Sequence, residues 1–397
     1  MPGRIIGVMG RVLDQEGGLG VYARCLLPEL LSQDPDTRYA IFLNTDKSRD
    51  LLRRFPNAEP HVLPARSKMY WDQITVALAA RRLDVDLIFN PKFSIPLLSG
   101  RPCVFAQQGS DWYVNPQNYE WWDNLYMRVM LPLYSRKARR TLGISQATLD
   151  DLSTYANIDV SSTAVTYAGV APNITAERDP EALARFRVKH RLPERFILTV
   201  SRAYHSAQRR LIVYPGGNDE TLVRAYRRYR ERGGALPLVV VGFRIEEYLR
   251  GRGFSDRELA DVHFLGLVPN TEIHLAYQAA ECFVLASLCE SFGIKILEAL
   301  ATGCPAIVPS TCASPEIAGG AARLINPHDE EEIAQALADV TGSEALRRTM
   351  RENGLQRAQA LTWRETARRT LAVFDEIIPR PVPAEGGVSG QVLSQGR

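Results

Sequence analysis

The sequence of 397 residues has no long apolar run, no strong excess of charge and no metal-binding pattern of cysteine and histidine. No stretch approaches the roughly 18 consecutive apolar residues that a membrane-spanning helix needs. The net charge of +3 is too small to indicate a nucleic acid as partner. The apolar run near the first methionine is too short for a signal peptide, so we expect a cytoplasmic protein.

The cysteines show no Cys-x-x-Cys motif and no spacing to histidine that would suit a metal ion. Most of them lie in apolar surroundings, so we predict reduced core thiols rather than disulfides. The six histidines form no ligand set either, so no metal and no cofactor are expected. The positions of the six cysteines are 25, 103, 282, 289, 304 and 312.

Short apolar runs alternate with helical stretches, which predicts a doubly wound parallel sheet. The plan is interrupted by a polar and charged boundary at 171–193 and resumes with the apolar run 196–200. The sequence therefore predicts two α/β domains, at 1–180 and 190–362. The segment from 379 to 397 is rich in proline, glycine and serine and is expected to be disordered. In the first domain, strands are expected at 5–9, 39–43, 61–63, 87–89, 103–106, 142–144 and 163–167, and helices at 21–31, 47–54, 72–83 and 119–140.

The most informative stretch runs from 282 to 310 and reads as strand, loop, helix and strand. Glu290 lies in the loop at the carboxyl end of the first strand, and Glu298 lies about one turn into the helix 294–302. A carboxylate accepts hydrogen bonds from two hydroxyls at once, which suits a sugar ring and a ribose diol. The amides of 293–295 at the helix start would face an anion. Together these features predict a nucleotide sugar as ligand.

This stretch resembles the E-x7-E motif of the family-4 glycosyltransferases (glycosyltransferases group 1), which are retaining enzymes of the GT-B fold. It reads Glu290-Ser-Phe-Gly-Ile-Lys-Ile-Leu-Glu298-Ala-Leu-Ala-Thr-Gly303-Cys-Pro305, and Pro315-Glu316-Ile317 and Asn326-Pro327 resemble further family segments. The resemblance implies two Rossmann-like doubly wound parallel-sheet domains facing a cleft. The acceptor would bind to the first domain, completed by a C-terminal helix at about 363–378, and the donor to the second. The alternative is an ordinary strand–helix–strand unit with two solvated glutamates.

Two loops of the first domain resemble family segments near the reacting groups. Gly17 and Gly18 fall in a glycine-rich loop that resembles the Gly-Gly-x-Gly-x-Tyr loop near the donor diphosphate; a plain tight turn is the alternative. Gln108 stands where many members have a histidine that contacts the donor sugar, and glutamine cannot titrate. Asp111 is the nearest carboxylate, and it is either an acceptor-side group or a helix cap.

The second domain carries the rest of the implied donor site. Arg202 matches an arginine that binds the diphosphate, but the lysine that normally follows is missing, and its place reads Gly217-Asn218 after an inserted loop at 203–216. Arg209, Arg210 or Lys295 would then supply the second positive charge. The full donor-binding set implied by the resemblance is Gly17, Gly18, Arg202, Leu267, Val268, Glu290, Phe292, Gly293, Ile294, Lys295 and Glu298.

The resemblance implies transfer of a hexose-type sugar from a nucleoside diphosphate sugar to a hydroxyl of a glycan, a lipid-linked sugar or a small molecule, with retention. The expected catalytic residues are Glu290, Arg202, Gln108 and Asp111, without a protein nucleophile. The alternative is a catalytically impaired GT-B protein that only binds a sugar nucleotide or a partner. Basic clusters in the first domain would contact an anionic bilayer at the inner face of the membrane, or a phosphorylated acceptor. The alternative is that they are solvated helix faces. These clusters contain Arg53, Arg54, Arg81, Arg82, Arg136, Lys137, Arg139 and Arg140.

Overall fold

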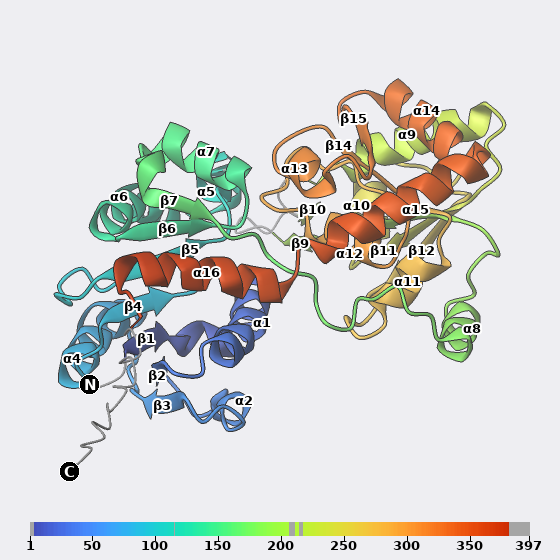
Figure 1. Ribbon diagram of the computed structural model, residues 1–397. Helices are drawn as coiled ribbons and strands as arrows, with labels where there is room; N and C mark the ends of the chain where they lie inside the picture. The colour runs from blue at the N-terminus through green and yellow to red at the C-terminus, as the bar shows by residue number, and fades with distance from the viewer. Residues whose placement is uncertain (1–3, 115, 206–210, 214–216, 381–397) are drawn as a thin grey trace, which may run out of the picture.

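The structure is a computed structural model that describes residues 4–114, 116–205, 211–213 and 217–380. It has two α/β domains side by side (Figure 1). The first holds a seven-stranded sheet in the order β3-β2-β1-β4-β5-β6-β7, and the second a six-stranded sheet in the order β12-β11-β8-β13-β14-β15. All strand pairs in both sheets are parallel. The predicted fold class is confirmed.

The first sheet has its most buried strands in the middle, as expected for a sheet covered by helices on both faces. Every residue of β4 and β5 is buried. The strands are β1 (Ile5–Met9), β2 (Arg38–Leu43), β3 (Ala58–Val62), β4 (Leu87–Asn90), β5 (Cys103–Gln107), β6 (Arg140–Gly143) and β7 (Thr163–Val165). The helices are α1 (Gly18–Gln33), α2 (Arg49–Leu52), α3 (Lys68–Tyr70), α4 (Val76–Arg82), α5 (Asp111–Val114), α6 (Trp121–Lys137) and α7 (Gln146–Ala156), with a π-helical turn at Trp71–Thr75 joining α3 to α4.

The second domain repeats the plan. Its strands are β8 (Ile197–Val200), β11 (Leu238–Val241), β12 (Val262–Gly266), β13 (Cys282–Val284), β14 (Ala306–Pro309) and β15 (Arg323–Ile325). Its helices are α9 (Asp219–Glu231), α10 (Ile245–Gly251), α11 (Ile273–Ala279), α12 (Ile294–Ala301), α13 (Ser314–Ala318), α14 (Glu330–Gly342) and α15 (Glu344–Gln359).

Two segments for which no helix or strand was predicted contain regular structure. The polar boundary includes α8 (Pro180–Lys189), whose start is capped by the carboxylate of Asp179. The inserted loop includes β9 (Ala203–His205) and β10 (Leu211–Val213), which pair antiparallel. Residues 206–210 and 214–216 of this insert lie outside the described residues, as does the predicted disordered segment from 381 onward.

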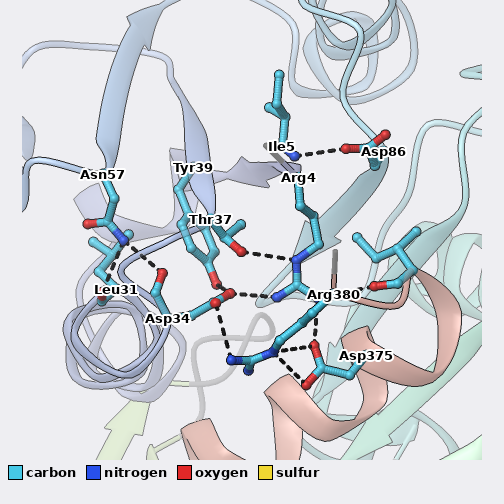
Figure 2. Close-up of polar contacts among 11 residues, drawn as sticks. Arg4, Ile5, Leu31, Asp34, Thr37, Tyr39, Asn57, Asp86, Asp375 and Arg380 are labelled. Carbon is cyan, nitrogen blue, oxygen red and sulfur yellow. Dashed lines mark hydrogen bonds and ion pairs between the residues drawn. The ribbon is translucent and has the colours of Figure 1, made fainter. Parts of the chain in front are cut away.

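The last helix, α16 (Trp363–Ile377), lies along the first domain (Figure 1) and packs against α1. A buried ion-pair network holds it there (Figure 2). The guanidinium of Arg4 lies 2.6 Å from the carboxylate of Asp34 and 2.6 Å from that of Asp375 in α16, and it donates to Thr37. Tyr39 donates a further hydrogen bond to Asp34. The charges are therefore paired where they are buried, which is the condition for tolerating them in a core.

Candidate active site

A cavity opens at the carboxyl ends of β8 and β13 in the second domain, the edge at which open α/β sheets bind ligands. Helix α12 begins there, after Gly293, whose backbone is in the left-handed region with φ +87°. Glu290 and Lys295, two of the predicted donor-binding residues, both line this cavity. The other lining residues are Thr199, Val200, Ser201, Gly217, Asn218, Asp219, Leu222, Leu285, Ala286 and Ser287.

The charged residues of the cavity are Lys295 and two carboxylates, those of Glu290 and the buried Asp219. Asp219 is almost fully buried at the start of α9 and accepts a hydrogen bond of 2.7 Å from the hydroxyl of Ser201. Burial raises the pKa of the Asp219 carboxyl, while Ser201 and the positive charge of Lys295 act in the opposite direction. Lys295 makes no hydrogen bond or ion pair within the part of the chain that the structure describes. Its ammonium group is therefore available to an anionic ligand.

Glu298 is not among the residues that line this cavity, and it is half-buried. The hydroxyl of Tyr277 in α11 donates a hydrogen bond of 3.0 Å to the Glu298 carboxylate, and Tyr277 itself is completely buried. Burial raises the pKa of Glu298 to about 7, against smaller opposing effects of Tyr277 and Lys295. Tyr277 was not predicted as a site residue, because in an apolar helix it reads as a core aromatic.

The loop that carries Glu290 is covalently joined to the loop after β14. Cys289 and Cys312 form a disulfide with their Cα atoms 5.4 Å apart, and the amide of Ala313 donates to the carbonyl of Glu290. The prediction of reduced thiols is therefore wrong for these two cysteines. They lie 23 residues apart in sequence, but β13 and β14 are neighbours, and their carboxyl ends bring the two loops together. The other four cysteines, 25, 103, 282 and 304, are free.

The predicted glycine-rich loop forms the start of α1 in the first domain. Gly17 precedes the helix with φ +82°, and Gly18 is its first residue. Arg24 donates to the carbonyl of Gln15 and so ties this loop back to the helix. A side chain at Gly20 would place its Cβ 1.8 Å from the same carbonyl, so the loop requires a glycine at this position.

The loop after β5 faces the Glu290 loop across the two domains. A Cβ built on Gly109 would lie 3.0 Å from the hydroxyl oxygen of Ser291, next to Glu290. The side-chain amide of Gln108 donates a 2.7 Å hydrogen bond to the carbonyl of Pro91. Asp111 is the first residue of α5, and its carboxylate accepts a hydrogen bond of 2.6 Å from a tyrosine hydroxyl. The structure thus brings the predicted Gln108 segment close to the Glu290 loop.

Polar contacts of Ser291 and Glu316 bind the second domain to the start of α7 in the first. Ser145 caps α7, as predicted, and its hydroxyl also donates to the carbonyl of Ser291 at 2.5 Å, as does that of Thr148 at 3.1 Å. The carboxylate of Glu316 accepts from the amide of Gln146 at 2.8 Å. A carboxylate at a helix start is favourable because of the exposed amides and the helix dipole. The Glu290 loop is therefore held from both sides.

The remaining predicted residues lie at the same edge of the second sheet. Arg202 lies two residues after the end of β8 and is exposed. Leu267 and Val268 follow β12; the first is exposed and the second buried. Phe292 is buried beneath the Glu290 loop, and Ile294 opens α12 with a partly exposed side chain. Arg209 and Arg210, two candidates for the missing charge, lie outside the described residues.

Lys92, a half-buried lysine after β4, was not predicted as a site residue. Its ammonium group donates to the side-chain carbonyl of Gln15, in the loop before α1. Burial, together with the charge of Lys68, lowers the pKa of Lys92 to about 8. No motif surrounds this lysine, and only the adjacent ends of β1 and β4 place it beside the glycine-rich loop.

Two parallel-sheet domains, with a last helix that returns to the first domain and a cavity at the edge of the second sheet, are the features of the GT-B fold. Residues 217–357 match the family model described as glycosyl transferases group 1. The match covers most of the second domain. Among the described residues, no group of histidine, cysteine, aspartate and glutamate could hold a metal ion, and no helix is long and apolar enough to cross a membrane.

The chain is similar to two curated mannosyltransferases and to a solved structure of the same fold. The serotype-specific mannosyltransferase WbdA of Escherichia coli is 24% identical over 219 residues, which is 54% of this chain and 26% of WbdA. The O-antigen chain mannosyltransferase B of Escherichia coli is 28% identical over 166 residues, 40% of this chain and 43% of that protein. The chain thus spans less than half the length of each of these two relatives. The structure of HepE of Anabaena in complex with UDP superposes with a TM-score of 0.68 at 17% identity, over 94% of this chain and all of that one.

Proposed function

We propose that the protein is a retaining glycosyltransferase that moves a hexose-type sugar from a nucleoside diphosphate sugar to a hydroxyl acceptor. The observation that carries this proposal is the joint position of Glu290 and Lys295 at one cavity, beside the start of α12. A carboxylate and a cation at a helix start suit a sugar linked to a diphosphate. The mannosyltransferase relatives and the neighbour bound to UDP support the same ligand class.

In the proposed complex the diphosphate lies at the start of α12, against Lys295 and Arg202. Glu290 accepts hydrogen bonds from the sugar hydroxyls, and Glu298 from the ribose diol. Gln108 cannot exchange a proton, so it orients the sugar, and the leaving phosphate oxygen takes the proton of the acceptor. The rate enhancement then comes from positioning and from stabilising the negative charge of the leaving diphosphate. The proposal requires no metal ion and no cofactor.

The test is thermal stabilisation of the wild type and of Glu290→Ala by UDP, GDP, ADP and dTDP sugars, each compared with its sugar-free nucleotide. A ligand at 100 times its Kd stabilises the native state by about 2.7 kcal/mol. We expect one nucleotide sugar to stabilise the wild type, with the contribution of its sugar lost in the variant. Product NMR then gives the anomeric configuration. No stabilisation by any nucleotide sugar, or an inverted product, would contradict the proposal.

A second candidate function is binding of a sugar nucleotide without turnover. The observation that favours it is the side chain of Gln108, which replaces a histidine of the family motif and donates to a backbone carbonyl. Turnover separates the two functions. Release of free nucleotide that depends on an added acceptor indicates the enzyme, whereas stabilisation by a nucleotide sugar without such release indicates the binding protein.

We also propose peripheral contact with an anionic membrane through the first domain. Trp121, Trp122, Leu125, Val129 and Leu133 of α6 are all more than 40% exposed. Basic side chains follow at the end of the same helix, and aromatic with basic side chains are typical of helices that lie in a membrane interface. Co-sedimentation with vesicles of anionic lipid, and not with neutral ones, would support the contact. Unchanged binding by Trp121→Ala/Trp122→Ala would contradict it.

A further inference from the structure

Three positively charged side chains from separate segments gather at the carboxyl edge of the first sheet. Arg11 follows β1, Lys68 begins α3, and Lys92 follows β4. The ammonium groups of Lys68 and Lys92 lie 5.8 Å and 5.2 Å from the ring centre of Phe93. The guanidinium of Arg11 lies 5.9 Å from the ring centre of Trp71 and is close enough to Lys92 to lower its pKa. We call these three residues the basic triad.

The charges of the basic triad are not balanced by the acidic group beside it. Asp72 is buried and lies 2.9 Å from Lys68, and it also accepts a hydrogen bond from a serine hydroxyl. Lys92 donates only to the neutral Gln15, and Arg11 Nη1 is buried without a hydrogen-bond partner among the described residues. Three positive charges and one negative charge leave a net charge of two. Unpaired buried donors are unfavourable unless a ligand satisfies them.

The basic triad lies on the acceptor side of the proposed site. Lys92 contacts the loop before α1 through Gln15, and the neighbouring carbonyl of Pro91 accepts from Gln108. Gln108 precedes Gly109, which approaches Ser291 beside Glu290. The triad is therefore connected to the Glu290 loop through first-domain residues, and it is separate from the cavity of the second domain that contains Lys295.

We propose that Arg11, Lys68 and Lys92 form a subsite for a phosphate group carried by the acceptor. A phosphate monoester has a charge of about −1.5 to −2 near pH 7 and three acceptor oxygens, which match the surplus charge and the free donors. A single carboxylate would leave about one positive charge unbalanced. This inference rests on the proposed function, and it assigns the acceptor to the class of phosphorylated sugars, either free or linked to a lipid through phosphate.

The experiment compares acceptors that differ only in phosphate. With the nucleotide sugar that stabilises the protein, transfer to hexose phosphates is measured against the same unphosphorylated hexoses, and a water-soluble short-chain lipid diphosphate sugar is tested in parallel. Hydrogen bonds to a charged group change affinity on the order of 10- to 100-fold. We expect kcat/KM to favour a phosphorylated acceptor by at least that factor. Preference for the lipid-linked or for the free form identifies the source of the phosphate.

Variants then assign the preference to the basic triad. Lys92→Gln should lose about tenfold or more in kcat/KM for the phosphorylated acceptor, while Lys92→Arg retains most of it. Neither should change activity toward the neutral sugar or the Kd of the donor. Arg348→Gln, which removes one exposed charge from α15 in the second domain, is the matched control. Inorganic phosphate should inhibit the wild type competitively with the acceptor, and Lys92→Gln less strongly.

Two outcomes separate this inference from the proposed function. If a nucleotide sugar binds and is turned over, but phosphate on the acceptor has no effect or Lys92→Gln loses activity equally on both acceptors, only the phosphate subsite is wrong. If no nucleotide sugar binds at all, the proposed function fails first. In that case, calorimetry measures the binding of inorganic phosphate to the wild type and to Lys92→Gln. If the wild type does not bind phosphate, the subsite is wrong as well.

Discussion

Glu298 provides a quantitative test because burial raises its pKa from the ordinary value of 4.5 to about 7. The unfolded chain would lose this proton near the ordinary value, whereas the folded protein keeps it until about pH 7. Between these two values the folded state binds more protons, so its stability decreases as pH rises. Each unit of pKa difference corresponds to about 1.4 kcal/mol, so the full effect above pH 7 is a loss on the order of 3 kcal/mol.

The perturbation is Glu298→Gln, which keeps an acceptor for Tyr277 but removes the titration. Urea unfolding of both proteins at pH 5, 6, 7 and 8 gives the difference in the free energy of unfolding. Other titrating groups cancel in this difference. We expect the variant to gain about 2.5 kcal/mol relative to the wild type between pH 5 and pH 8. A difference that stays constant within about 0.5 kcal/mol over this range would refute the raised pKa.

The same residue predicts the pH dependence of donor binding. If the ionised carboxylate of Glu298 holds the ribose diol, binding requires loss of its proton. At pH 6, about one molecule in eleven would be ionised, so the apparent Kd should be about tenfold higher than at pH 8. A nucleoside diphosphate sugar has no terminal phosphate monoester that titrates near pH 6. Isothermal titration calorimetry measures the effect, and an equal pH dependence in Glu298→Gln would contradict the role.

Three further predictions concern stability. Reduction of the Cys289–Cys312 disulfide, or replacement of both cysteines by serine, should lower the free energy of unfolding by about 3 kcal/mol, because the disulfide closes a loop of 23 residues. An unchanged urea midpoint would count against the bond. Arg4→Met should lower the free energy of unfolding by roughly 3 to 5 kcal/mol, because buried aspartate charge loses its partner; a loss below about 1 kcal/mol would show that the network is dispensable. Gly20→Ala should lower the free energy of unfolding by about 1 to 3 kcal/mol, because its Cβ would overlap a loop carbonyl. Gly18→Ala, which has open space around its Cβ, is the control in thermal unfolding. Equal effects of the two substitutions would contradict the clash.

Local sequence predicted most of the regular elements. The strand 5–9 has the predicted bounds, and β2, β4 and β5 differ from theirs by one residue, because their apolar runs and flanking residues leave one arrangement. Elements in polar surroundings were missed. Helix α8 lies in the charged boundary, where a single buried phenylalanine holds it, and β9 and β10 lie in the insert. Their periodic apolar pattern is too short to distinguish them from a loop.

In the candidate site too, the residues of one local unit were predicted and the contacts between separate elements were not. Glu290 and Lys295 were predicted together because a single strand–loop–helix unit places both at the start of α12. The position of Glu298 in the helix was predicted as well, but its hydrogen bond with Tyr277 was not, because Tyr277 comes from another helix. The same spacing therefore brings Glu290 to the cavity and leaves Glu298 outside its lining, beside Tyr277.

By itself, the sequence determined the alternation of strands and helices, the two sheets and the helix that carries the E-x7-E spacing, because these depend on neighbouring residues. Only the tertiary structure decided the contacts between distant segments. The disulfide of Cys289 with Cys312 requires adjacent strands. The gathering of Arg11, Lys68 and Lys92 requires the order of β1 and β4 in the sheet. The sequence determines which residues carry a charge or a thiol. The order of the strands in each sheet determines which of these residues lie next to one another.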